Sequence, residues 1–344
     1  MARDQARFDM DLDEIVAHTA GVWDDLDESR LLITGGSGFF GRWLLESAAA
    51  AHRKLGNRCR ITVLARRPER LLSAAPHLRL PFIEYRAQDI RTLSGDFGRF
   101  DYILHAATSS TVPSAALETI ETTIEGTRRV LDLAESSNAR GVLITSSGAV
   151  YDRQAPLHVE EDYLGAPDVS MPDAAYGEGK RLAELLCSIY ARQRGVPTKI
   201  ARCFAFAGPF LPLDAHFAFG NFIRDALAGG PIVIRGDGSP LRSYMYGTDL
   251  CIWLLTLLVR GEAGRAYNVG ADEEIAIGDL ARAIAGRFDP APAVDIAQPP
   301  DQSRPRHIYV PSIDRARDEL GLRPTVSLRD AIDRTLAWHK AESV

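Results

Sequence analysis

The first two hundred residues alternate short apolar runs with longer amphipathic stretches. The apolar runs are rich in β-branched residues, which is typical of strands buried on both faces. They are 30–34, 60–65, 82–87, 101–107, 141–147 and 198–204. Amphipathic stretches lie between them, among them 42–52, about 114–134 and the segment after Tyr176. This alternation predicts an α/β fold with a doubly wound parallel sheet.

The second half of the chain is less regular. Proline and glycine interrupt 208–240, and the proline-rich segment 290–305 is typical of a surface connection. Residues 11–27 place apolar side chains at helical spacing, which predicts an extra helix packed on the sheet domain or, alternatively, an interface helix. The expected units are an N-terminal helical extension (1–29), a dinucleotide-binding domain (30–205 with 241–270) and a smaller α+β substrate domain (206–240 with 271–344).

Composition and charge limit the classes of partner. Of the 344 residues, 46% are hydrophobic and 25% charged, and the formal net charge is −6. This acidic balance disfavours nucleic acid and anionic membranes. The N-terminus lacks the apolar core of a signal peptide, and the longest apolar run, 251–259, is far shorter than the roughly 20 residues of a membrane span. The four cysteines form no CxxC pair, so we expect a cytoplasmic protein without a metal site.

A glycine-rich turn follows the first predicted strand directly. The segment TGGSGFFG (34–41) spaces Gly35, Gly38 and Gly41 three residues apart and opens the first helix. Such a turn lets backbone N–H groups at a helix N-terminus approach a pyrophosphate. Glycines alone often mark only a tight turn, but the strand before and the helix after provide the context that the motif requires. The sequence therefore predicts a Rossmann-type sheet that binds a dinucleotide.

The end of the second predicted strand bears on which dinucleotide binds. NAD-binding sheets usually place an acidic residue there, to accept hydrogen bonds from the ribose hydroxyls. This chain has Ala65 followed by Arg66 and Arg67, and a guanidinium suits a 2′-phosphate. We therefore favour NADP over NAD, although a solvated basic turn would look the same. Asp89, which ends the third strand, is a candidate contact for the adenine.

A serine, a tyrosine and a lysine stand in an order that suggests proton transfer. Ser147 ends the fifth strand, at the carboxyl edge where open α/β sheets bind ligands. Tyr176 and Lys180 are four residues apart, so on a helix they share a face. A neighbouring ammonium favours the phenolate and would lower the tyrosine pKa toward neutrality. A YxxxK pair also occurs by chance in many helices. Gly177 and Gly179 lie between the two, and we interpret them as positions of close approach to a cofactor.

Taken together, these motifs resemble the extended short-chain dehydrogenase/reductase family, which works mostly on nucleotide-activated sugars. The resemblance extends from about Arg30 to about Pro324. It is carried by TGGSGFFG (34–41), HAA (105–107), SSGAVY (146–151), YGEGK (176–180), RCFAFAGP (202–209), GDGSPLRSYMYGTD (236–249) and YNVG (267–270).

The resemblance implies roles for particular residues. Ser147, Tyr176 and Lys180 would be catalytic, and Lys180 would also bond the nicotinamide ribose. The implied cofactor-binding residues are Gly35, Gly38, Phe39, Phe40, Gly41, Arg66, Asp89, Ile90, Ala106, Ala107, Tyr176 and Lys180. The implied substrate-binding residues are Ser147, Gly148, Asn221, Arg242 and Arg304, with the two arginines on the diphosphate of a nucleotide-diphosphate sugar.

The resemblance also implies a homodimer, because family dimers pair the helix of the active-site tyrosine with the helix before it. An apolar face that could serve this contact, or could instead pack on the sheet, consists of Leu182, Leu185, Leu186 and Tyr190. His105 is expected to pack near the cofactor without acting as a base. His216 could line the substrate cleft, and a core or surface role is equally compatible with its sequence.

Departures from the family pattern narrow the expected activity. The 4,6-dehydratases of the family carry an Asp–Glu pair after the serine position, and the decarboxylases carry a glutamate there. Gly148 and Ala149 occupy these places and cannot transfer protons. Dehydration, and with it decarboxylation, is therefore disfavoured. Thr123 and Ala205 stand where asparagines are usual and Asp152 where glycine is usual, which leaves the substrate open.

Two enzymatic activities remain. In the first, NADPH reduces a 4-keto nucleotide sugar at C4 while Tyr176 donates the proton. In the second, a tightly held NAD oxidises C4 transiently and returns the hydride to the other face, which gives a 4-epimerase. The arginine after Ala65 favours reduction. A remote third alternative is a dinucleotide sensor without catalysis, although such proteins typically lose the tyrosine or the lysine.

Overall fold

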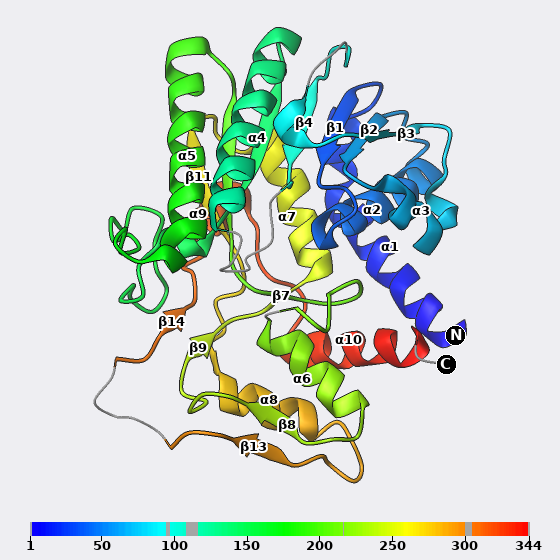
Figure 1. Ribbon diagram of the computed structural model, residues 1–344. Helices are drawn as coiled ribbons and strands as arrows, with labels where there is room; N and C mark the ends of the chain where they lie inside the picture. Colours follow the sequence, from blue (N-terminus) through cyan, green and yellow to red (C-terminus); the bar gives the residue numbers. More distant parts are fainter. Residues whose placement is uncertain (1, 94–96, 108–115, 216, 300–304, 343–344) are drawn as a thin grey trace.

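A seven-stranded parallel sheet forms the centre of the computed structural model, which describes residues 2–93, 97–107, 116–215, 217–299 and 305–342 (Figure 1). The strand order is β11-β6-β5-β4-β1-β2-β3. Every pairing in this sheet is parallel. The strands are β1 (Arg30–Thr34), β2 (Arg60–Ala65), β3 (Ile83–Ala87), β4 (Tyr102–His105), β5 (Gly141–Ser147), β6 (Thr198–Cys203) and β11 (Arg265–Val269). The predicted doubly wound α/β fold is confirmed.

Helices cover both faces of this sheet, as the apolar strands require. Alternate side chains of β1 enter different cores: Leu31 and Ile33 belong to one, and Leu32 belongs to the other. The first core contains side chains of α2 (Phe39–Leu55) and α7 (Gly247–Arg260). The second contains side chains of α4 (Ala116–Ser137) and α5 (Ala175–Arg194), which lie side by side in Figure 1.

The residues proposed for a dimer face divide between surface and core. Leu182 and Leu185 of α5 are 40% and 54% exposed. Tyr190 is buried and its hydroxyl donates to Asp132 of α4, and Leu186 packs partly against the same core. The inner half of this face therefore joins α5 to α4 and the sheet, and only the outer half is left on the surface.

The N-terminal segment forms one helix, α1 (Ala2–Asp25), which packs against α2 and α7. Its buried Asp11 accepts hydrogen bonds from the Tyr246 hydroxyl at 2.7 Å and from Arg334 at 2.5 Å. Because Arg334 lies on α10 (Leu328–Glu342), this carboxylate ties together both ends of the described chain. Figure 1 shows the two termini next to each other.

The second half adds small sheets and helices below the main sheet in Figure 1. The pairings are β10 with β7, β13 with β8, and the three-stranded set β12-β9-β14. Thus β9 lies outside the seven-stranded sheet, whereas β11 joins it and α9 packs on β11. The bounds are β7 (Phe206–Ala207), β8 (Ile232–Ile234), β9 (Leu241–Arg242), β10 (Met245–Tyr246), β12 (Ile275–Ala276), β13 (Val294–Ile296), β14 (Ile308–Tyr309), α3 (Pro68–Ala74), α6 (Ala218–Leu227), α8 (Ile277–Ala285) and α9 (Asp314–Leu320).

None of the helices in the described residues combines the length and the hydropathy needed to cross a bilayer. The apolar run at 251–259 lies within α7, whose side chains are almost all buried in the protein core.

Candidate active site

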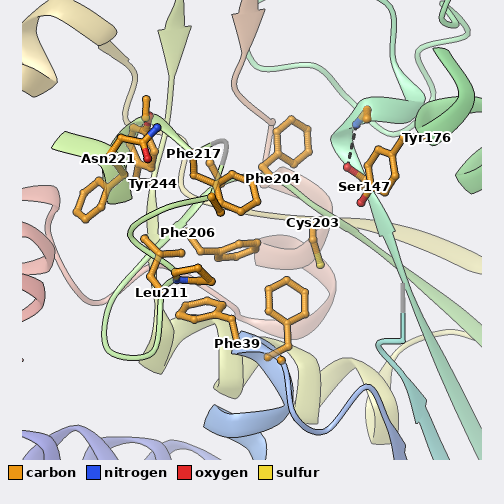
Figure 2. Close-up of a pocket in the computed structure, with 18 of the residues that line it drawn as sticks. Phe39, Ser147, Tyr176, Cys203, Phe204, Phe206, Leu211, Phe217, Asn221 and Tyr244 are labelled. Carbon is orange, nitrogen blue, oxygen red and sulfur yellow. Dashed lines mark hydrogen bonds between the residues drawn. The ribbon is translucent and has the colours of Figure 1, made fainter. Parts of the chain in front are cut away.

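A large cavity opens at the carboxyl ends of the sheet strands. Its volume is about 1710 Å³. Single small-molecule sites are typically about 300–1,000 Å³, so there is room for two ligands placed end to end. The lining begins at the glycine turn before α2, passes the ends of β2, β4 and β5, and reaches α6 and β14. Figure 2 shows the region between Ser147 and Asn221.

The glycine turn has the geometry of a pyrophosphate cradle. Gly35 has φ +74°, and a Cβ there would lie 2.6 Å from the Ala106 carbonyl oxygen. Gly38 lines the cavity and caps α2 without a side-chain hydrogen bond, so the first N–H groups of the helix have no cap from that residue. Gly41 does not line the cavity. A Cβ there would meet Gly36 Cα at 2.3 Å, so this glycine lets the helix pack closely on the turn.

The other predicted cofactor residues continue from this turn along one side of the cavity. Phe39, Phe40, Arg66, Ile90, Ala106 and Ala107 all line it, together with Asp89. Asp89 accepts a hydrogen bond from the backbone N–H of Arg91 at 2.9 Å and forms an ion pair with its guanidinium at 2.8 Å. These bonds lower the pKa of Asp89. The glycine turn is too tight for any other residue, and the groove continues from it to Lys180. This arrangement suits a bound dinucleotide.

Ser147, Tyr176 and Lys180 come together at the other end of this groove. The Ser147 hydroxyl accepts a hydrogen bond from Ala149 N–H at 3.1 Å, drawn dashed in Figure 2. It also lowers the pKa of the Tyr176 phenol, which lines the same part of the cavity, and it lies 3.3 Å from the Tyr309 hydroxyl. Lys180 Nζ donates to the Thr145 carbonyl at 2.7 Å and lies 5.9 Å from the centre of the Tyr176 ring.

The electrostatics of this group differ from the expectation. Burial raises the pKa of Tyr176, and the interaction of the phenol with Ser147 only partly offsets this effect. Burial also lowers the pKa of Lys180 to about 8. The expected lowering of the tyrosine pKa by Lys180 is therefore wrong for this state of the protein. The reason is that desolvation disfavours the charged form of both groups, while the amine is directed at the Thr145 carbonyl.

The structure does not bear out the expected role of Gly177 and Gly179 beside a cofactor. Neither lines the cavity. A Cβ on Gly177 would lie 2.3 Å from the Ala149 carbonyl oxygen, in the 3-10 turn 148–150. A Cβ on Gly179 would meet nothing closer than Thr123 Cβ of α4, at 3.8 Å. Gly177 thus allows α5 to approach the turn that follows Ser147, and close approach to a cofactor does not explain either glycine.

Two of the predicted substrate residues other than Ser147 line the cavity. Asn221 and Arg242 line the far end of the cavity. Arg242 donates to the carbonyl oxygens of Leu241 at 2.8 Å and His307 at 3.1 Å, and its guanidinium lies 3.1 Å from His307 Nδ1. Gly148 does not line the cavity, because it packs against the Phe204 ring, which a Cβ would meet at 2.8 Å. Arg304 and His216 lie outside the described residues.

Part of the cavity wall was not predicted. Three aromatic side chains from the segments after β6 and before α6, Phe204, Phe206 and Phe217, join the predicted Phe39 and Phe40 at the start of α2. The rings of Phe40 and Phe206 pack edge to face at 5.1 Å. Ala205, where the family has asparagine, lies between two of them and also lines the cavity. Tyr309 was not predicted either, since no local pattern marks it.

His105 is a packed strand-end residue. It is buried at the end of β4, and its Nδ1 lies 2.7 Å from Thr34 Oγ1. Burial, with a smaller contribution from the charge of Lys180, lowers its pKa to about 3. The ring is therefore neutral at physiological pH. The described residues contain no group of three or more His, Cys, Asp or Glu side chains that could hold a metal ion.

Comparison with known proteins gives the same class as the fold and the site. A profile of the NAD dependent epimerase/dehydratase family matches residues 31–270. The chain belongs to this family of enzymes. The resemblance to the extended short-chain dehydrogenase/reductases is thereby confirmed.

Several relatives carry more specific names. UDP-glucuronic acid decarboxylase 1 of Arabidopsis thaliana is 29% identical, over 90% of this chain and 69% of the relative. A dTDP-glucose 4,6-dehydratase of Streptomyces venezuelae, solved with NAD, is 26% identical and covers 91% of this chain and 97% of its own, with a TM-score of 0.76. An epimerase of Methanothermobacter thermautotrophicus has a TM-score of 0.77 at 24% identity, covering 98% and 97%.

These names bear on the sequence predictions. Decarboxylases and dehydratases are among the relatives, so the comparisons give no support to the exclusion of these two reactions. The Streptomyces relative binds NAD, so the preference for NADP gains no support either. Both predictions depend on residues of this chain alone.

Proposed function

We propose that this protein is an NADP-dependent oxidoreductase of nucleotide-diphosphate sugars, which reduces a 4-keto group at C4. The observation that carries the proposal is the meeting of Ser147 and Tyr176 hydroxyls at the inner end of a dinucleotide groove, with Lys180 beside them. When bound, the nicotinamide supplies or accepts a hydride. The side chains must then bind the substrate oxygen and move one proton.

The protonation state of Tyr176 suits reduction. Its raised pKa keeps the phenol neutral at pH 7, so it is an acid that can donate to a carbonyl oxygen as negative charge develops there. Ser147 adds a second hydrogen-bond donor for the same oxygen. Burial lowers the pKa of Lys180 to about 8, so its amine is mostly charged at pH 7 and lies 5.9 Å from the centre of the Tyr176 ring.

Two departures from the family pattern support reduction by NADPH over dehydration or decarboxylation. Gly148 and Ala149 carry no group that could remove or return a proton at a neighbouring carbon. Arg66 lines the cavity after Ala65, where a 2′-phosphate would accept hydrogen bonds from its guanidinium. At the far end, Arg242 and Asn221 suit a diphosphate. The named relatives act on UDP-glucuronic acid and dTDP-glucose, which supports a nucleotide-diphosphate sugar as the substrate class.

The second candidate is a 4-epimerase with tightly bound NAD. The same three side chains serve it, because each half-reaction needs one hydride position and one proton relay. NAD in the Streptomyces relative is the observation that favours it. A non-catalytic sensor is a third, remote candidate, which the retained Tyr176 and Lys180 speak against.

A homodimer is proposed through the outer face of α4 and α5. Leu117 of α4 is 79% exposed, and it joins Leu182 and Leu185 of α5 on these two adjacent helices. Light scattering after gel filtration should give twice the chain mass. A monomeric mass at micromolar concentration would reject this arrangement.

One experiment separates the candidate functions. The purified protein is denatured, and the nucleotide it releases is identified by mass spectrometry. Stoichiometric NAD favours the epimerase, whereas an empty site that binds NADPH favours the reductase. The protein is then incubated with NADPH and a 4-keto nucleotide sugar. Products are scored for reduction, epimerisation, dehydration and decarboxylation, and either of the last two would contradict the proposal.

The proton donor is tested by Tyr176→Phe. This variant should lose turnover at least 100-fold while its affinity for the dinucleotide changes less than about twofold, because only the phenol oxygen is removed. Normal turnover would show that another group transfers the proton.

A further inference from the structure

We propose that Tyr309 is a positioning residue for Ser147, whose hydroxyl hydrogen it directs toward the substrate oxygen. The inference rests on the proposed function and adds to it a side chain from the far end of the chain. The two hydroxyl oxygens lie 3.3 Å apart, although 162 residues separate them in sequence.

The structure holds Tyr309 firmly at this position. It lies in β14, which pairs in parallel with β9 so that Tyr309 is opposite Arg242. Its ring packs on Phe204 at 4.7 Å between centres, and the Arg242 guanidinium lies 5.7 Å from its centre. The hydroxyl also lies 3.4 Å from the Cys203 carbonyl oxygen at the end of β6. Tyr309 therefore extends from the arginine at the substrate end to the serine at the catalytic end.

Hydrogen-bond capacity explains what the phenol does. A serine hydroxyl has one hydrogen to donate and two lone pairs to accept with. Ala149 N–H already donates to Ser147, at 3.1 Å. If Tyr309 donates to the second lone pair, the Ser147 hydrogen must point away from both donors, toward Tyr176 and the cavity. A substrate oxygen bound beside Tyr176 would receive it there.

Tyr309 is suited to donate. Burial raises its pKa well above the ordinary value for tyrosine, so the phenol keeps its hydrogen across the working pH range. This hydrogen has two acceptors in reach, Ser147 Oγ and the Cys203 carbonyl. Donation to Cys203 leaves the Ser147 hydrogen free to turn toward Tyr309. A bound substrate accepts the Ser147 hydrogen and therefore favours the arrangement in which Tyr309 donates to Ser147.

The first test is Tyr309→Phe, which keeps the ring and its packing. A lost hydrogen bond of about 1–1.5 kcal/mol in the transition state predicts a fall in kcat of about tenfold. KM for the sugar nucleotide should stay within about twofold, because no group that holds the diphosphate changes. Tyr163→Phe is the matched control. Tyr163 packs against the same small aromatic cluster, but its hydroxyl donates a hydrogen bond to Asp152. The kcat of the Tyr163→Phe variant should therefore equal that of the wild type.

The second test is a double-mutant cycle with Ser147→Ala, measured in single turnovers so that slow rates remain accessible. If Tyr309 acts through Ser147, adding Tyr309→Phe to Ser147→Ala should lower the rate no further. Multiplied losses in the double variant, or a Tyr309→Phe enzyme with the wild-type kcat, would overturn the inference and leave the proposed function intact. Failure of the wild-type protein to turn over any nucleotide sugar would instead reject both. Thermal unfolding of each variant checks that the fold is kept.

Discussion

Gly177 and Gly179 offer a paired test of how the helix and the serine turn fit together. Both lie in the first turns of α5, and both are buried with ordinary helical backbone. Alanine at either site gains helix propensity of up to about 1 kcal/mol. The two sites differ in what a methyl group would meet, so the same substitution should have opposite effects.

The distances set the magnitudes. At Gly177 the new Cβ would lie 2.3 Å from the Ala149 carbonyl oxygen, about 1 Å closer than contact allows, and the neighbouring atom belongs to the backbone. Overpacking of this kind costs up to about 3 kcal/mol, which leaves a net loss of about 2 kcal/mol after the gain in propensity. At Gly179 the nearest atom, Thr123 Cβ, would be 3.8 Å from the new methyl group, which is ordinary contact. Gly179→Ala should therefore gain about 0.5–1 kcal/mol.

The assay compares both variants with the wild type in thermal unfolding and in turnover. For a chain of this length 1 kcal/mol shifts Tm by about 1.5 °C, so Tm should fall about 3 °C for Gly177→Ala and rise about 1 °C for Gly179→Ala. Turnover should fall about 100-fold for Gly177→Ala only, since moving Ala149 displaces the N–H that holds Ser147. Equal changes in both variants, or an unaffected Gly177→Ala, would refute this explanation of the glycines.

Three further outcomes follow from the charges in the site. Since burial lowers the pKa of Lys180 to about 8, kcat for reduction should fall as pH rises through 8, and Lys180→Met should lower kcat at pH 7 and remove that limb of the profile. His105 has its pKa lowered to about 3, so the unfolded chain binds a proton below pH 6.5 that the folded protein does not. As pH falls from about 6 to about 4, this proton uptake at His105 should reduce the free energy of unfolding by about 1.4 kcal/mol per pH unit, measured by urea unfolding. The His105→Gln variant should lack this part of the pH dependence. Arg66→Ala should raise KM for NADPH about tenfold and leave KM for NADH unchanged; equal effects on both would reject the 2′-phosphate contact.

Much of the fold could be predicted from the sequence because the central strands are buried on both faces. Each of the six apolar runs is a strand of the main sheet, three with the predicted bounds and three with ends shifted by one or two residues. The strand predicted at 101–107 ends at His105, and Ala106 and Ala107 leave the sheet to line the cavity. Helix α1 begins at Ala2, well before the predicted residue 11. Among residues 6–10 only Phe8 is buried, so no apolar periodicity marks the helix there.

The candidate site was less predictable where it depends on contacts between distant segments. Ser147, Tyr176 and Lys180 could be found because strand end and helix spacing bring them together. The packing of Gly177 on Ala149 could not, since it depends on where the turn after β5 lies. Tyr309 belongs to a strand of two residues, too short to leave a hydrophobic pattern.

The precision of the site depends on what holds the end of β5 on its two sides. Successive residues of a strand face opposite ways, so Ser146 and Ser147 cannot share partners. Ser146 donates to Glu184 of α5 at 2.5 Å, and Arg202 of β6 forms an ion pair with the same carboxylate at 2.7 Å. Ser147 is held by Ala149 and lies beside two phenols. Catalytic groups must be placed within about 0.5 Å. Because buried partners hold the end of β5 on the Ser146 side, the Ser147 oxygen stays in place while its hydroxyl hydrogen can rotate. The proposed effect of Tyr309 is to fix the direction of that hydrogen.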